Sequence, residues 1–64
     1  MNQIEFDWMK NLESKVDAAW DSLTAWEQEF VESLLERFRL YGIKTRMSPN
    51  QWERIREIYD SKIV

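Results

Sequence analysis

Two helix-start signals constrain the fold of this 64-residue chain more than any other feature. Residues 24–27 (Thr-Ala-Trp-Glu) and 48–51 (Ser-Pro-Asn-Gln) both fit the capping box, in which the first and fourth side chains bind each other's backbone amides. Pro49 stands at the first helical position, where the lack of an amide proton costs nothing. Gly42, the only glycine, can adopt the left-handed conformation that ends many helices. The sequence therefore predicts helices that begin near residues 25 and 49.

Apolar residues recur every three or four positions, as expected for helices that each bury one face. The predicted faces are Ile4, Trp8, Leu12, Val16, Ala19 and Trp20 in the first helix, Trp26, Phe30, Leu34, Phe38 and Tyr41 in the second, and Trp52, Ile55, Ile58, Tyr59 and Ile63 in the third. The pattern predicts an all-α fold with helices over about 3–20, 25–41 and 49–62.

The three predicted helices are expected to form one small domain over residues 1–64. Short connections favour a helical hairpin of the second and third helices, to which the first is added. A chain of this size buries only about 60% of the surface that it exposes when unfolded. The first helix can therefore either fold back on its own hairpin or pair with a second copy, and the sequence leaves both arrangements open. It also leaves open whether the chain is a whole protein or a fragment.

The composition argues against an enzyme. The chain has no cysteine and no histidine, which excludes the usual zinc, haem and iron–sulfur sites. It has no Gly-rich phosphate loop and no nucleophile beside a base, so we expect no catalytic residue, cofactor, metal or small-molecule substrate. No apolar run of about 20 residues and no signal-peptide pattern occur, so we expect a cytoplasmic protein without a membrane partner.

Charge is divided unevenly along the chain, although the net charge is only −3. Residues 1–36 carry nine acidic side chains and two lysines, a net charge of −7. Residues 37–56 carry one acidic and six basic side chains, a net charge of +5; the basic ones are Arg37, Arg39, Lys44, Arg46, Arg54 and Arg56. The hairpin would gather these six at one end, where they would form an electrostatic footprint for nucleic-acid phosphates or an acidic protein.

A second interpretation gives the same cations structural roles. Arg37 and Arg39 would complement the negative end of the second helix. Surface ion pairs would engage others, such as Glu36 with Arg39 and Arg56 with Asp60. Lys44 and Arg46 fit this interpretation less well, because they lie in the connection and have few acidic neighbours in the sequence. These two residues favour a binding role.

The polar residues of the second and third helices have simpler explanations than catalysis or base reading. Glu29, Glu32 and Glu36 line one side of the second helix. Carboxylate pairs hold cations in some helical proteins, but those sites usually add histidine, so we expect a solvated acidic face. Ser48 and Gln51 are explained by capping, which leaves little support for a helix-turn-helix reader of base edges.

The chain carries nine aromatic residues, a heavy load for its length. Trp8, Trp26 and Trp52 fall on the predicted inward faces, so we expect them in the core rather than as stacking platforms for bases. Three apolar residues lie off the main stripes and are predicted to form a protein-binding or self-association surface: Phe6, Met9 and Val31.

Residues 20–62 resemble a short helical module of bacteriophage proteins. The resemblance lies in W-x-x-L-T-x-W-E-x-x-F-x-x-S-L from Trp20, then Y-G at Tyr41, S-x-x-Q at Ser48 and I-x-x-I-Y at Ile55. It implies a setting among small phage proteins and segments attached to phage replication or recombination proteins. The matching positions are capping and core residues, so the resemblance supports the fold and carries no catalytic residue. The first 19 residues and the basic loop 43–46 fall outside it.

The leading functional hypothesis is a non-enzymatic accessory module of phage-type nucleic-acid metabolism, in the host cytoplasm if the chain is phage-encoded. Residues 37–56 would contact nucleic-acid phosphates or an acidic surface of a replication or repair protein. One alternative is a small acidic phage-type inhibitor whose glutamates at 29, 32 and 36 bind a host protein in place of nucleic acid. Another is a self-assembling structural helix module, that is, a homo-oligomer. The choice between DNA and RNA stays open.

Overall fold

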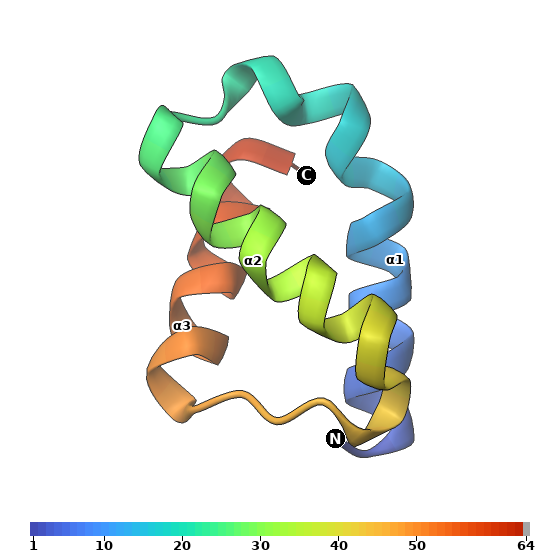
Figure 1. The fold of residues 1–64 in the computed structure, drawn as a ribbon. Coiled ribbons are helices and arrows are strands. Elements are labelled where there is room, and N and C mark those ends of the chain that lie inside the picture. The colour runs from blue at the N-terminus through green and yellow to red at the C-terminus, as the bar shows by residue number, and fades with distance from the viewer. Residues whose placement is uncertain (64) are drawn as a thin grey trace.

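The computed structural model describes residues 1–63, which form three α-helices joined by short turns (Figure 1). The helices are α1 (Gln3–Ala19), α2 (Ala25–Tyr41) and α3 (Pro49–Ile58). The 3₁₀ turns η1 (Trp20–Ser22) and η2 (Gly42–Lys44) follow α1 and α2, and the π-helical turn η3 (Tyr59–Ile63) follows α3. No strand occurs in residues 1–63. The predicted all-α fold of three helices is confirmed.

Each of the three α-helices begins with a complete capping box. In the two predicted boxes, the Thr24 and Ser48 side chains accept the amide protons of Glu27 and Gln51, whose side chains accept in return. A third box, which was not predicted, lies at the start of α1. There the Asn2 side chain accepts from the Glu5 amide at 2.8 Å, and the Glu5 carboxylate accepts from the Asn2 amide at 3.1 Å. These caps explain why the helix starts lie where they do.

Gly42 ends α2 in a backbone conformation that L-residues rarely adopt. Its φ of 56° is positive, as predicted, but its ψ of −130° differs from that of the left-handed helix. The Gly42 amide still donates to the carbonyl of Phe38, so the last turn of α2 is closed. The chain then turns sharply away from the axis of α2 into η2. Glycine is needed here for its freedom from Cβ strain rather than for space, because nothing lies within 4 Å of the Cβ position.

The first helix folds back on the other two helices of its own chain. In Figure 1, α2 crosses diagonally between α1 and α3, and the segment after η2 runs along one end of the molecule to the start of α3. Both η2 and η3 contact α1. The side-chain amide of Asn11 donates to the Tyr59 hydroxyl at 2.8 Å. Of the two arrangements that the sequence left open, the structure therefore has the intramolecular one.

The core lies where α1, α2 and α3 converge. Its buried apolar residues are Met9, Leu12, Val16, Leu23, Val31, Leu34, Leu35, Phe38, Ile55 and Ile58. Aromatic rings of α1 pack against rings of both other helices. The Trp8 ring lies 5.8 Å from that of Trp52 and 5.2 Å from that of Tyr59, and the Phe6 ring lies 5.2 Å from that of Phe38. No helix of residues 1–63 is long and apolar enough to cross a membrane.

The inward faces differ from the predicted ones in two of the three helices. In α1, Ile4 is 81% exposed, and Met9 is fully buried in its place. In α2, the buried stripe includes Val31 and Leu35, whereas Tyr41 is exposed. Each observed face keeps part of the predicted one and is rotated from it by less than one residue, or less than about 100° of helix. The third helix buries Ile55 and Ile58 as predicted.

Candidate functional site

A buried threonine positions the basic connection between α2 and α3. Thr45 is only 2% exposed, and its hydroxyl donates to the carbonyl oxygen of Gly42 at 2.7 Å and lies 3.3 Å from that of Arg37. Its neighbours Lys44, the last residue of η2, and Arg46 are both exposed to solvent. The buried threonine thus anchors the connection between two exposed cations.

Arg37 joins these two cations. Its guanidinium Nη2 donates to the carbonyl oxygen of Arg46 at 3.3 Å, which holds the arginine against the connection. Within residues 1–63, none of Arg37, Lys44 and Arg46 forms an ion pair. We call these three residues the basic end. Their charges face water and are open to an anionic partner.

The other three predicted basic residues lie elsewhere and have partners within the chain. The Arg39 guanidinium pairs with the Glu13 carboxylate of α1 at 2.8 Å. Arg54 pairs with Glu57 at 3.6 Å, and the Arg56 guanidinium lies 5.7 Å from the centre of the Trp52 ring. The predicted pairs Glu36–Arg39 and Arg56–Asp60 do not form among residues 1–63. Of the six predicted cations, three thus have partners within the chain and three form the basic end.

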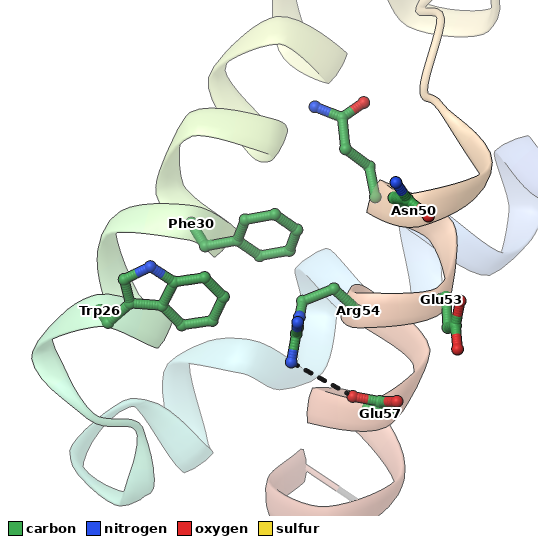
Figure 2. A pocket seen from close by; sticks show the side chains of 7 residues that line it. Trp26, Phe30, Asn50, Glu53, Arg54 and Glu57 are labelled. Atoms are coloured by element: carbon green, nitrogen blue, oxygen red, sulfur yellow. Dashed lines mark ion pairs between the residues drawn. The ribbon is translucent and has the colours of Figure 1, made fainter.

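A groove of about 440 Å³ separates the start of α2 from α3 (Figure 2). Figure 2 shows the Trp26 and Phe30 rings extending from α2 toward Arg54 of α3, with Asn50 and Glu57 on the α3 side. Gln51 and Glu53 complete its lining. We call this the aromatic groove. It combines stacked apolar rings with charged and amide side chains, as binding grooves commonly do.

Trp26 was expected in the core, and that prediction is wrong. The residue lies in the first turn of α2 and is 54% exposed, although Arg54 of α3 lies beside its ring. Its ring stacks on that of Phe30, with centroids 5.4 Å apart and planes 10° apart. Trp8 and Trp52 are half-buried and pack against the core as expected. Hydrophobic spacing alone cannot reveal this difference, because all three tryptophans continue an apolar stripe.

The protein-binding surface predicted at Phe6, Met9 and Val31 is also corrected. Met9 and Val31 are both 0% exposed and belong to the core. Phe6 is half-buried against Phe38. Residues that fell off the expected stripes are thus part of the real ones, because the helices are rotated from their expected orientation. Met9 and Val31 thus offer no free surface to a partner, and Phe6 offers only part of its side chain.

Three acidic side chains of α2 face solvent. Glu29, Glu32 and Glu36 are exposed, and none forms an ion pair within residues 1–63. Glu29 lines a hollow between α2 and Gln51 of α3. Glu32 lines a different hollow, together with Trp20 of η1. In the part of the chain that the structure describes, no group of acidic residues is arranged to hold a metal ion.

Comparison with protein-family models, with curated proteins and with solved structures finds no match to this chain. The fold defines it as a small all-α domain of three helices. Among its surfaces, the basic end and the aromatic groove have the most distinctive chemistry.

Proposed function

We propose that this chain is a non-enzymatic binding module that contacts nucleic-acid phosphates through the basic end. The observation that carries the proposal is the gathering of Arg37, Lys44 and Arg46, exposed and without ion pairs inside residues 1–63. The resemblance of residues 20–62 to a phage helical module favours a role beside replication or recombination proteins.

The charge distribution supports contact at this end alone. Phosphates are attracted by exposed Arg and Lys side chains, and each contact releases condensed counterions. Residues 1–36 carry a net charge of −7, which repels phosphates from most of α1 and α2. A nucleic acid would therefore meet the molecule in one orientation, with the basic end toward it.

A pair of charge reversals tests this proposal against a matched control. Lys44→Glu with Arg46→Glu changes the net charge by −4, and Lys10→Glu with Lys15→Glu on α1 changes it equally. Binding of labelled DNA and RNA oligonucleotides is measured by fluorescence anisotropy across salt concentrations. We expect the first variant to lose at least tenfold in affinity and the control to lose much less. With three phosphate contacts, the slope of log K against log salt would be about −2 to −3.

The proposal fails if no oligonucleotide shows salt-dependent binding, or if the two double variants lose affinity equally. Equal losses would mean that net charge, and not the basic end, governs the interaction. Loss of binding to an acidic replication or repair protein, with no nucleic-acid binding at all, would assign the basic end to a protein partner instead.

The row of unpaired glutamates favours a second candidate function, an acidic inhibitor that occupies a basic nucleic-acid groove of a host protein. Spacings of three and four residues place Glu29, Glu32 and Glu36 near one another along exposed α2. Charge reversal of all three glutamates to lysine tests this function in a pull-down from bacterial lysate. Retention of one host protein that is lost on reversal, without nucleic-acid binding by the parent chain, would support it.

A further inference from the structure

We propose that the aromatic groove receives an unpaired base of single-stranded nucleic acid whose phosphates lie on the basic end. This inference rests on the proposed function and specifies its ligand. It assigns Trp26 as the stacking residue, with Arg54 beside it. The partner is therefore expected to be single-stranded rather than duplex.

The geometry of Trp26 suits stacking. The ring is more than half exposed, although it is large and apolar and stands beside a buried core. Phe30 supports it from one side at 5.4 Å, and the Arg54 guanidinium lies 5.5 Å from its centroid. Arg54 is held in turn by Glu57 at 3.6 Å. Nucleic-acid bases stack on aromatic rings and on guanidinium planes, and this groove presents both together.

The groove continues toward the basic end. A second hollow shares Trp26, Phe30 and Gln51 with the first and extends along α2 past Leu34 to Arg37. Trp26 and Arg37 are eleven residues apart, or about 16 Å along the helix. Arg37 in turn contacts the backbone of Arg46. A single strand can thus follow one path from the basic end to the exposed tryptophan.

The carboxylates of the groove define which part of a nucleotide fits there. Glu29, Glu53 and Glu57 line the two hollows and oppose the approach of a phosphate. An uncharged base has no such penalty, and the amide of Asn50 at the groove can hydrogen-bond to a base edge. The groove therefore takes a base from further along the strand than the phosphates that the basic end contacts.

Base pairing would block this mode of binding. In a duplex, the faces of each base are covered by its neighbours, and exposing one face requires unstacking. A single strand offers its bases at little cost, and stacking on a side chain is tolerant of sequence. Preference for single strands, with little dependence on sequence, is the expected signature of Trp26.

Three ligands and two variants test the inference. The ligands are a single-stranded oligonucleotide of about 12 nucleotides, the same strand with abasic sites, and the corresponding duplex. We expect the parent chain to bind the intact strand about tenfold more tightly than the other two. Trp26→Ala should remove that tenfold preference and leave binding to the abasic strand unchanged. Leu40→Ala, which alters a 76% exposed residue of the same helix, is the matched control and should change nothing.

The inference is separable from the proposed function. If the intact, abasic and duplex ligands bind equally, and only reversal of Lys44 and Arg46 weakens them, the groove plays no part and the basic end still does. If no ligand binds, both proposals fail. A loss of abasic-strand binding in Trp26→Ala would also overturn the inference, because Trp26 would then act on the phosphate contacts. The comparison of intact and abasic strands on the parent chain stands even where a variant does not fold.

Discussion

Single polar side chains fix the ends of the elements in this small protein. Thr45 is the clearest case, because its buried hydroxyl is satisfied by carbonyls at the end of α2 and thereby orients the cations on either side. A buried hydroxyl without such partners would cost about 1–3 kcal/mol. The side chain that shapes the basic end is therefore one that contacts no ligand. We regard Thr45 as a positioning residue for Lys44 and Arg46.

Glu27 leads to a prediction about pH. Its Oε1 accepts the Thr24 amide proton at 2.8 Å and lies 3.7 Å from the Lys62 ammonium, and these contacts hold the pKa of the carboxyl below its ordinary value. The backbone amide of Thr24 is the larger cause. A lowered folded pKa stabilises the fold above the ordinary glutamate value of 4.5, and this contribution is lost as the pH falls through the folded pKa.

Glu27→Gln isolates this contribution, because glutamine keeps the cap but does not titrate. Urea unfolding at pH about 7 and about 3 measures both chains. The variant should be less stable than the parent at the higher pH, and the difference should shrink at the lower pH. The remaining carboxylates titrate in both chains and cancel in the comparison. A difference that does not vary with pH would contradict the assignment.

At the scale of elements, the helix boundaries could be predicted from the sequence and the buried faces only in part. A capping box is a local pattern whose hydrogen bonds close within four residues, so 24–27 and 48–51 predict their helices without tertiary information. The face that a helix buries depends on its neighbours. Ile4 fits the apolar stripe predicted for α1 and Met9 lies off it, yet the positions of α2 and α3 bury Met9 and leave Ile4 exposed.

The same reason explains which parts of the candidate site were missed. The charge of residues 37–56 was visible in the sequence, but the pairing of Arg39 with Glu13 joins residues 26 positions apart. The exposure of Trp26 likewise depends on how much of its side chain α3 packs against. No local pattern reports contacts of that kind.

Two substitutions on α1 test its observed orientation. Met9→Ala removes a fully buried side chain and should destabilise the protein by about 2–5 kcal/mol. Ile4→Ala alters an 81% exposed side chain and should change the stability by less than about 0.5 kcal/mol. Chemical denaturation followed by circular dichroism measures both. A larger effect of Ile4→Ala than of Met9→Ala would show that the helix buries the face that the sequence suggested.

At the scale of the whole molecule, the contacts of the core all form within a single chain. The Cα radius of gyration is 10.9 Å, close to the value of about 10.7 Å for a compact domain of this length. The buried faces of all three helices meet within the chain, and α1 is joined to α2 by Glu13–Arg39 and to η3 by Asn11–Tyr59. The acidic side chains of α1 and α2 would also repel those of a second copy placed against them.

These features predict a monomer, in contrast to the self-assembling alternative. Light scattering should give a mass near the 7.9 kDa of one chain. The urea midpoint should not change when the protein concentration is varied about a hundredfold. A midpoint that rises with concentration, together with a doubled mass, would show that α1 pairs between copies. In that case the core contacts of Met9 and Leu12 would form between chains, and Met9→Ala would weaken association as well as folding.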